Sequence, residues 1–461
     1  MLGMIKIKIM KNMNLYNKKL RDTLLMFIIT FILLEVTFYF LLSSGLLYSA
    51  FYPTLSSHDK SNTFLNRGAY YDIFSGYKWQ SGYTRVVRIW KGEIIFDNQF
   101  HANNYGYVSN QNYFPQKDEN TYRIIVLGDS FTAGTMYGET WPDRLQALLN
   151  KNANNKYKYE VYSFALDGIG IDNWYRQFIY EIMPDFDFDA VMIASYVGDL
   201  FRVFVMSDQL EDQIVSGAVS LKSNNVYNQP NSYKEFFNFY QPKLSVGGWI
   251  KSDWEMDNII SSVKGWQWRK MDFYATKHLL NLFSSNDVDI FSEAYIKERE
   301  TSFKQNKLKI NKTYKKLRTI DMYDIKKELT TGELRFVQKM YKNRYFGTNQ
   351  LGKFIKLYKI VQLCKQKNIP VILSAIPNRD VLLKRKTTGK DSQHQNEYHQ
   401  LSKILKIHYF DGYRVFDSIK PDDITNKYWL KYDGHWNLLG SGHYANQLSP
   451  YLLSLFEKEK I

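Results

Sequence analysis

The stretch "RIIVLGDSFTAG", residues 123–134, decides the fold. The four apolar residues 124–127 predict a strand buried on both faces, as in parallel sheets that are covered by helices. The run stops at Gly128, Asp129 and Ser130. Ligands of open α/β sheets bind beyond the carboxyl ends of the strands, so a hydroxyl there is a candidate nucleophile. An ordinary loop at the edge of a sheet would also explain it.

The chain alternates between strand and helix patterns on both sides of a long interruption. Before it, we expect strands at 123–127, "YEVYSFAL" (159–166) and "DAVMIASY" (189–196), with helices near 141–150 and 173–182. After it, we expect a helix at 350–367, strands at "IPVILSAIP" (369–377) and "YRVFDS" (413–418), and a last helix at 438–456. Alternation of this kind predicts an α/β fold, a three-layer α/β/α sandwich around a parallel sheet.

These patterns divide the chain into a core and two additions. The predicted core covers residues 118–202 and 346–461. Residues 52–117, with the strand-like runs "TRVVRIW" and "EIIFDN", are predicted to be a lead-in segment that packs on it. Residues 203–345 are predicted to be a large, mainly helical insertion.

A nucleophilic serine needs a base, and the base needs a group that orients it. Of the eight histidines, only His435 lies in a pattern that explains its position. The segment "KYDGHWNLLG" (431–440) places Asp433 two residues before it, where both side chains point the same way in an extended or turning segment. A carboxylate there can accept the imidazole N–H and fix the tautomer that takes the serine proton. Asp-x-His alone is common by chance, but it is informative beside Gly-Asp-Ser at a strand end.

Acyl transfer also requires hydrogen-bond donors aimed at the developing oxyanion. The backbone N–H of Ser130 is one candidate. Gly168, in "ALDGIGIDN" (165–173), is another, because it follows the second strand and has no side chain to block a substrate. An ordinary strand-to-helix turn is the alternative interpretation of that glycine.

Four motifs in order, "GDSF", "DGIGIDN", "YVGDL" and "DGHWNLLG", resemble the signature blocks of the SGNH/GDSL hydrolase superfamily. The resemblance covers roughly residues 118–202 and 350–456. It implies a three-layer α/β/α fold and serine acyl chemistry on esters, with no metal and no cofactor. By this resemblance Ser130 is the nucleophile, His435 the base and Asp433 its orienting acid. The N–H groups of Ser130 and Gly168 contribute to the oxyanion hole. Asp129, between Gly128 and Ser130, stabilises the turn and has no catalytic role.

Two positions depart from the family pattern. The spacing Asp-x-His is similar to that of a membrane-linked SGNH-like branch that handles acetyl groups on extracellular polysaccharides. The third block normally supplies an asparagine to the oxyanion hole, but this chain has Asp199, and an ionised carboxylate does not donate. Three outcomes follow: Asp199 is protonated and donates, another group such as Arg202 replaces it, or the site is weak or inactive.

The N-terminus predicts a compartment. Residues 1–22 carry six Lys and Arg against one acid, and the nineteen residues Leu24–Leu42 that follow contain one charged residue, Glu35. Nineteen helical residues nearly span a hydrocarbon core of about 30 Å. The positive-inside rule then predicts a cytoplasmic segment at 1–22, a transmembrane anchor within 23–51 and an extracytoplasmic remainder. A signal peptide cleaved after Gly45 and a buried helix of a soluble protein are the alternatives.

Composition adds further limits. The single cysteine, Cys364, excludes an intrachain disulfide and is expected to be a small buried hydrophobe. The net charge is +15, and residues 297–318 contain nine Lys and Arg against two Glu. A solvated helix face explains this stretch, and a surface for anionic lipid or acidic glycan is the functional alternative. Nucleic acid is excluded as a partner by the predicted extracytoplasmic location.

The sequence therefore predicts a membrane-anchored serine esterase that acts on ester groups, O-acetyl or other O-acyl, of cell-envelope glycans. One alternative is an O-acyltransferase, in which a sugar hydroxyl instead of water takes the acyl group. A second alternative is a non-catalytic glycan-binding or assembly protein on the same fold.

Overall fold

The computed structural model describes residues 18–37, 62–66, 69–79, 81–90, 93–152, 157–202, 293–314, 320–341 and 351–458. They fall into two compact units. A helix at residues 18–37 belongs to one unit, and apart from Glu93 the strands and helices named below belong to the other.

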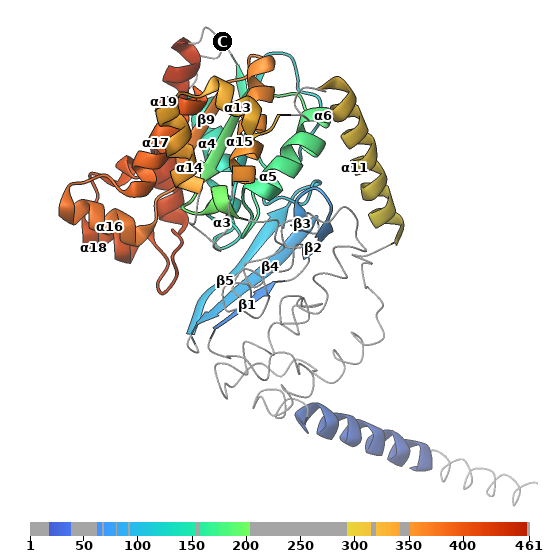
Figure 1. Cartoon of the computed structure of the whole chain (residues 1–461). Coiled ribbons are helices and arrows are strands. Elements are labelled where there is room, and N and C mark those ends of the chain that lie inside the picture. The colour runs from blue at the N-terminus through green and yellow to red at the C-terminus, as the bar shows by residue number, and fades with distance from the viewer. Residues whose placement is uncertain are drawn as a thin grey trace, which may run out of the picture. The chain divides into compact units, whose positions relative to one another are not determined.

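The centre of the larger unit is a parallel sheet of five strands in the order β10-β9-β8-β6-β7. The strands are β6 Thr121–Gly128, β7 Lys158–Ser163, β8 Ala190–Ser195, β9 Val371–Ala375 and β10 His408–Asp411. In their register Gly128 pairs with Ala194, and Ser195 pairs with Ala375. The residues that follow β6, β8 and β9 therefore all begin at the carboxyl ends of the strands, on the same side of the sheet (Figure 1).

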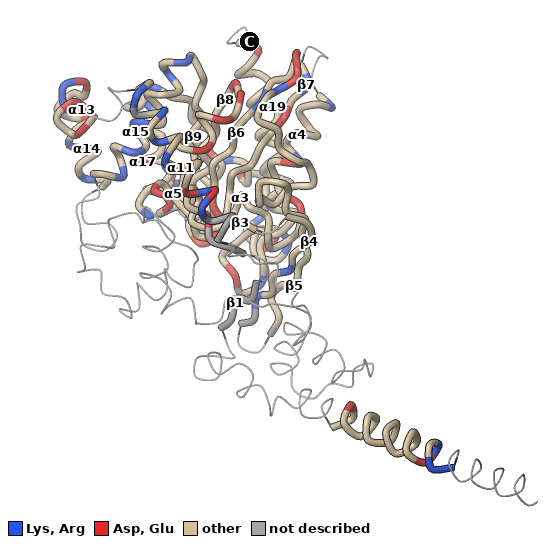
Figure 2. Tube along the Cα trace, turned by 90° about the vertical axis from the view of Figure 1, so that its right-hand side faces the viewer, with Lys and Arg blue, Asp and Glu red and all other residues tan. Residues whose placement is uncertain are grey.

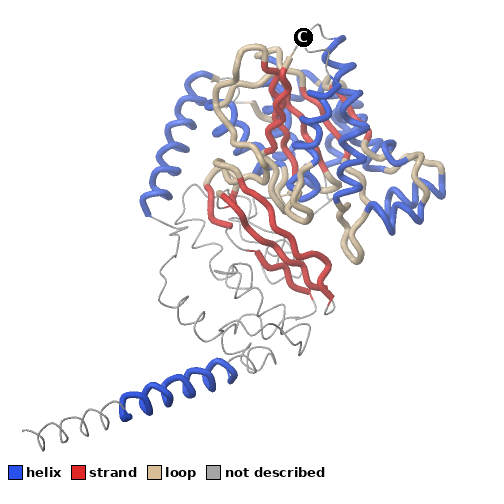
Figure 3. The backbone as a smooth tube through the Cα atoms, turned by 180° about the vertical axis from the view of Figure 1, so that it is seen from behind, coloured by secondary structure: helices blue, strands red, loops and turns tan. Residues whose placement is uncertain are grey.

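Helices cover both faces of this sheet (Figure 3). The connection β6-α4-β7 runs toward one edge and β7-α5-β8 returns past β6, so right-handed crossovers place α4 and α5 on opposite faces. In agreement, α4 packs against α19, and α5 packs against α15. The bounds are α3 Ser130–Ala133, α4 Trp141–Asn152, α5 Ile171–Gln177, η2 Phe178–Ile182, α6 Met183–Asp185, η3 Asp199–Phe201, α15 Leu351–Gln366, α16 Arg379–Thr388, α17 Gln393–Leu405, η5 Arg414–Phe416, α18 Pro421–Asp423, η6 Ile424–Tyr428 and α19 Leu438–Lys458.

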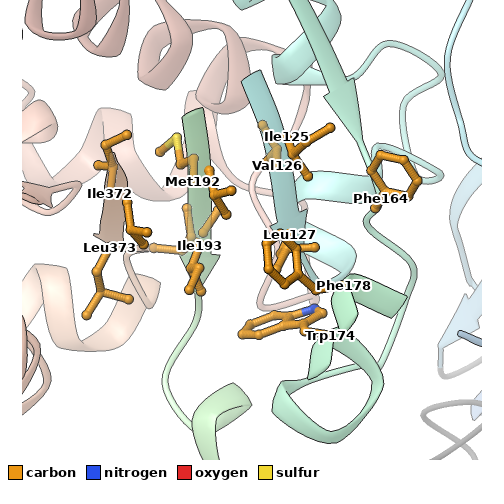
Figure 4. Packing of buried hydrophobic residues seen from close by; sticks show 14 of the residues in the cluster. Ile125, Val126, Leu127, Phe164, Trp174, Phe178, Met192, Ile193, Ile372 and Leu373 are labelled. Atoms are coloured by element: carbon orange, nitrogen blue, oxygen red, sulfur yellow. The ribbon is translucent and has the colours of Figure 1, made fainter. Parts of the chain in front are cut away.

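Apolar side chains of neighbouring strands fill the space between sheet and helices (Figure 4). Leu127 of β6, Ile193 of β8 and Leu373 of β9 have no exposed surface. Fully burying a side chain of this size contributes about 1.5–3 kcal/mol. Trp174 of α5 packs in the same layer and donates its indole N–H to the carbonyl of Gly128 at 3.0 Å. The end of β6 is thereby fixed just before Ser130.

Most predicted core elements are confirmed, but the strand at 413–418 is wrong. The last strand is β10, five residues earlier, and residues 414–416 form the short helix η5. The chain turns after β10 because the Asp411 carboxylate accepts the N–H of Tyr413 at 3.1 Å. Gly412 lies against β9 so closely that a Cβ would be 2.4 Å from the carbonyl oxygen of Ala375. Tyr413 and Phe416 are buried three positions apart, as on one face of a helix. The run 413–418 is too short for periodicity alone to separate a helical turn from a strand.

The lead-in segment contains both predicted strands. β4 Gly82–Trp90 and β5 Glu93–Ala102 join β1 Asn62–Asn66 in a sheet of order β1-β4-β5. β2 Ala69–Asp72 and β3 Gly76–Trp79 form a separate hairpin.

The described part of the predicted insertion is helical, and residues 203–292 lie outside the described residues. Its helices are α11 Glu293–Thr313, α13 Met322–Glu328 and α14 Thr331–Tyr341. Figure 2 shows Lys and Arg along α11, and Lys297, Lys304 and Lys312 are exposed there. Arg299 is different, because its guanidinium forms ion pairs with Asp72 at the end of β2 and with Glu181 of η2.

Two predictions concern residues away from the core sheet. Cys364 is buried and free, as expected, and burial raises the pKa of its thiol. Of the predicted anchor, residues 23–37 lie in the N-terminal helix and residues 38–51 lie outside the described residues. Among the described helices, none is both long and apolar enough to cross a membrane.

Candidate active site

The turn after β6 presents Ser130 at the edge of the sheet. Asp129 is the N-cap of α3, and its carboxylate accepts the N–H of Phe131 at 3.0 Å, which is the turn-stabilising role predicted for it. Gly128 is required by space, because a Cβ at this position would be 2.3 Å from the Thr132 hydroxyl. The chain leaves α3 through Gly134 in the left-handed conformation, at φ 71°. Ser130 is thus held between two glycines that no larger residue replaces without strain.

The hydroxyl of Ser130 meets the imidazole of His435 from a segment 305 positions away, and Oγ lies 2.7 Å from Nε2. On the other side of the ring, Nδ1 lies 2.5 Å from Oδ1 of Asp433. The same oxygen accepts the backbone N–H of His435 at 2.9 Å. The structure therefore brings together the three side chains predicted as nucleophile, base and orienting acid.

The Asp433 carboxylate determines the tautomer of the ring. Burial alone would raise the pKa of Asp433, but the His435 imidazole and its two hydrogen bonds, with Arg88 nearby, hold that pKa well below its usual range. An ionised carboxylate only accepts, so Nδ1 carries the proton. In the neutral ring Nε2 is then the acceptor, and the Ser130 O–H donates to it.

A narrow loop holds Asp433 and His435 in place. Trp429 and Trp436 pair across its base, and the N–H of Leu430 donates to the His435 carbonyl at 2.9 Å. Arg379, at the start of α16, donates from Nη1 to the Asp433 carbonyl at 3.1 Å. Tyr432, at the loop tip, has φ 60°, a left-handed conformation that is uncommon for a bulky residue.

Aromatic side chains connect the loop to the nucleophile turn. The indole N–H of Trp436 donates to the Phe131 carbonyl at 3.0 Å. The Phe131 ring lies 4.5 Å from the His435 ring and stacks on Tyr196 at 4.5 Å. Phe131 follows Ser130 directly in the chain. The contacts that hold Phe131 therefore also restrict where the Ser130 hydroxyl lies relative to the His435 imidazole.

The predicted oxyanion donors lie in two turns that are tied together. Ser130 N–H is among the first N–H groups of α3, which have no partner within the helix. Gly168 has φ 73°, in the left-handed region that favours glycine. Its neighbour Asp167 accepts the hydroxyl of Thr135, just after the nucleophile turn, at 2.9 Å and 3.0 Å.

Asp199 follows β8 at the same edge of the sheet and is completely buried. Its Oδ2 accepts the N–H of Tyr196 at 2.7 Å, which closes the turn after the strand. Its Oδ1 lies 3.5 Å from Nε of Arg202. In these contacts the Asp199 side chain accepts one hydrogen bond, from Tyr196, and forms an ion pair with Arg202.

Arg379, Tyr196 and Asn378 are parts of this site that the sequence reasoning missed. Asn378 contacts the Tyr196 hydroxyl through its Nδ2 and caps α16 by accepting the N–H of Val381 at 3.1 Å. The signal that could have found Asn378 and Arg379 is their place just after the fourth strand of the predicted sheet. Tyr196 lies inside one of the four motifs, but nothing in that motif indicates stacking on Phe131.

The site shows no arrangement for a metal. Within the described ranges, no group of three or more His, Cys, Asp or Glu side chains is placed to hold a metal ion.

Comparisons with known proteins return distant structural likenesses. No protein-family model and no curated protein matches the chain. Among solved structures, it is similar to a variant of Axe2, an acetyl-xylooligosaccharide esterase from Geobacillus stearothermophilus, with 10% identity, TM-score 0.31, and coverage of 72% of this chain and 93% of that one. A catalytic variant of the same esterase has 9% identity with the same coverage and TM-score. The salicylyl-acyltransferase SsfX3 from a tetracycline biosynthetic pathway has 10% identity, TM-score 0.28, and coverage of 86% of this chain and 78% of that one. At such low similarity, the function proposed next rests on the geometry of the site.

Proposed function

We propose that this protein is a serine esterase of the SGNH type that forms an acyl-enzyme on Ser130. The observation that carries the proposal is the continuous hydrogen-bond chain from Ser130 Oγ through the His435 ring to Asp433, with donor–acceptor distances of 2.7 Å and 2.5 Å. A hydroxyl that donates to a neutral, oriented imidazole is the activated nucleophile of acyl transfer.

The reaction follows from this chain of hydrogen bonds. As Ser130 Oγ attacks the ester carbonyl, its proton passes to Nε2 of His435, and the Asp433 carboxylate stabilises the imidazolium. The carbonyl oxygen becomes an oxyanion beside the N–H groups of Ser130 and Gly168. Collapse of this intermediate breaks the bond to the alcohol, which takes the proton from His435. Water then attacks the acyl-enzyme by the same steps and releases the acid and free Ser130.

For the substrate we propose O-acyl groups, such as O-acetyl, on glycans outside the cytoplasmic membrane. The basic segment at 1–22 and the apolar stretch that follows support a membrane location with this unit on the far side. An alcohol in place of water would give transfer of the acyl group to a second sugar. The two outcomes differ in their product, which is free acetate or a newly acetylated glycan.

The test is covalent labelling of the full-length chain with a fluorophosphonate, followed by peptide mass spectrometry. We expect the adduct on Ser130, and we expect Ser130→Ala and His435→Asn to abolish both labelling and hydrolysis of p-nitrophenyl acetate. His443→Asn is the matched control, because His443 lies in α19 and contacts the Val415 carbonyl at 2.9 Å instead of Ser130. Labelling that is equal in the parent and in Ser130→Ala would refute the proposal.

A further inference from the structure

One guanidinium connects two buried carboxylates beside the nucleophile. Arg202 Nε lies 3.5 Å from Oδ1 of Asp199, and Arg202 Nη1 lies 3.8 Å from Oδ2 of Asp129. The two acidic side chains are at most 1% exposed, and the Arg202 side chain is 16% exposed. The same Oδ2 of Asp129 is 3.5 Å from Ser130 Oγ, so one carboxylate group separates the guanidinium from the reacting hydroxyl.

Arg202 also binds the turn that carries the second oxyanion donor. Its Nη1 donates to the carbonyl of Ile169, the residue after Gly168, at 3.3 Å. The aliphatic part of the side chain lies against Gly170, where a Cβ would be 2.6 Å from Cβ of Arg202. The guanidinium is thus fixed between the turn of Ser130 and the turn of Gly168, the two segments whose N–H groups would face an oxyanion.

The charges of Asp129, Asp199 and Arg202 also influence a neighbouring side chain electrostatically. Burial raises the pKa of Tyr196, which stacks on Phe131, to about 12. The carboxylates of Asp129 and Asp199 act in the same direction, and Arg202 opposes them. A negative charge that develops near Tyr196 experiences the same field, because two buried anions repel it and one cation attracts it.

We propose that Arg202 is a positioning residue for the oxyanion site, and that it offsets the charge of Asp199. This inference rests on the proposed function. The guanidinium fixes the Ser130 and Gly168 turns relative to each other and neutralises one of two carboxylates that would otherwise oppose an oxyanion. Asp199 is then compatible with acyl transfer as long as its cation is present.

The experiment is a double-mutant cycle of Arg202→Gln and Asp199→Asn in the full-length chain, with p-nitrophenyl acetate turnover and the rate of fluorophosphonate labelling as readouts. Asn at position 199 keeps an oxygen to accept the Tyr196 N–H, so the turn retains its hydrogen bond. We expect Arg202→Gln to lower kcat and the labelling rate by about 100-fold, the scale for losing one oxyanion contact, with little change in KM. Arg202→Lys should recover part of the rate. In the double variant, where one carboxylate and the cation are both absent, kcat should return to within about 10-fold of the parent.

A matched control separates this effect from the loss of any arginine ion pair. Arg414 also contacts two carboxylates, Asp391 at 3.1 Å and Asp411 at 3.2 Å, but it is 58% exposed. Arg414→Gln should leave kcat unchanged. The inference is overturned if Arg202→Gln keeps the parent rate, or if the two substitutions reduce the rate additively while circular dichroism shows folded protein. Failure of the proposed function is a separate result, since the parent would then show no label on Ser130.

Discussion

Two groups of buried charges in the same folded unit differ in how they are balanced. The first, the Asp72 cluster, consists of Asp72, Lys78, Glu181 and Arg299, two acids with two cations. Arg299 lies 2.5 Å from Asp72 and 2.9 Å from Glu181, and Lys78 lies 2.5 Å from Glu181. The second, the site charges, consists of Asp129, Asp199, Arg202, Asp433 and His435. Among the site charges, the Arg202 guanidinium lies 3.5 Å from Asp199 and 3.8 Å from Asp129.

The difference indicates what each group does. In the Asp72 cluster the charges join the β2–β3 hairpin, η2 and α11, so the balance serves to hold elements together. Breaking a buried pair leaves an uncompensated charge and typically costs about 3–5 kcal/mol. The site charges instead contact a hydroxyl, an imidazole and the turns that carry backbone N–H groups. In the resting protein Asp129 and Asp199 each hold a turn through a hydrogen bond. Their surplus over the nearby cation also changes the energy of charges that form during a reaction.

The largest expected effect on the site charges is that of Asp433→Asn. The amide does not stabilise an imidazolium and favours the wrong tautomer of His435, so we expect kcat to fall by about 1,000- to 10,000-fold. The measurement is p-nitrophenyl acetate hydrolysis, with thermal unfolding to show that the fold is kept. Asp380→Asn is the control, because the Asp380 side chain, two positions after Asn378, is 81% exposed. A decrease in kcat of less than 10-fold would show that the short Asp433–His435 contact contributes little to catalysis.

The corresponding change in the Asp72 cluster is Arg299→Gln, which should act on stability instead of activity. It leaves Asp72 and Glu181 with Lys78 as the remaining cation of the cluster, and we expect the free energy of unfolding to fall by about 2–4 kcal/mol. Urea titration followed by fluorescence measures this change. The exposed Arg414→Gln should cost less than about 1 kcal/mol. If Arg299→Gln lowers kcat of the folded protein as strongly as Arg202→Gln, the division between the two groups is wrong.

The sequence predicted the parallel core and the main site residues because both depend on local patterns. Buried parallel strands read as continuous apolar runs, and β6, β8 and β9 are found where such runs occur. Ser130, His435 and Asp433 could be paired because each lies in a short motif at an element boundary. The strand at 413–418 was misplaced because a run of six residues is too short for its periodicity to separate one buried turn of helix from a strand.

The parts that the sequence did not predict depend on contacts across the fold. Nothing in the sequence around Arg299 indicates that it pairs with Asp72, which is 227 positions earlier. The sequence around Arg379 likewise resembles that of an ordinary exposed arginine. Its contact with the loop of Asp433 follows from the position of α16 after β9. Asp199 in place of the expected amide, and Arg202 as a candidate to replace that amide, were visible in the sequence, but the ion pair between the two became evident from the fold.

A pH titration sharpens the comparison on the side of the Asp72 cluster. Burial would raise the pKa of Asp72, but Arg299, Lys78 and the bonds from Ser75 lower it below its usual value. An acid with a lowered pKa stabilises the fold above its unfolded pKa, near 4, and that contribution is lost as the pH falls below it. We expect the parent to lose about 1–2 kcal/mol from this group between pH 4 and pH 2, and Asp72→Asn to show a shallower dependence. Equal slopes would mean that the cluster does not hold the charge of Asp72.

The smallest expected effect concerns Asp143 of α4, whose hydrogen-bond donors are uncharged. Its Oδ1 accepts the Ser109 hydroxyl at 2.8 Å and its Oδ2 accepts the Asn110 N–H at 3.4 Å. Burial raises the pKa of Asp143 to about 6, although these hydrogen bonds lower it. The sign is opposite to that of Asp72: the neutral acid is favoured in the fold, so stability is full below the unfolded pKa near 4 and is lost as the pH rises through 6.

Asp143→Asn should therefore remove a pH dependence instead of an interaction. The amide oxygen still accepts the Ser109 hydroxyl, so the variant and the parent should be nearly equal in stability at pH 4. At pH 8 the variant should be more stable by about 1 kcal/mol, because it has no carboxylate to keep ionised in a mostly buried position. Urea titrations at the two pH values measure this difference. A variant that is less stable at both would mean that Asp143 is held as a charged group, like the acids of the Asp72 cluster, and that a buried acid in this unit needs no cation to remain ionised.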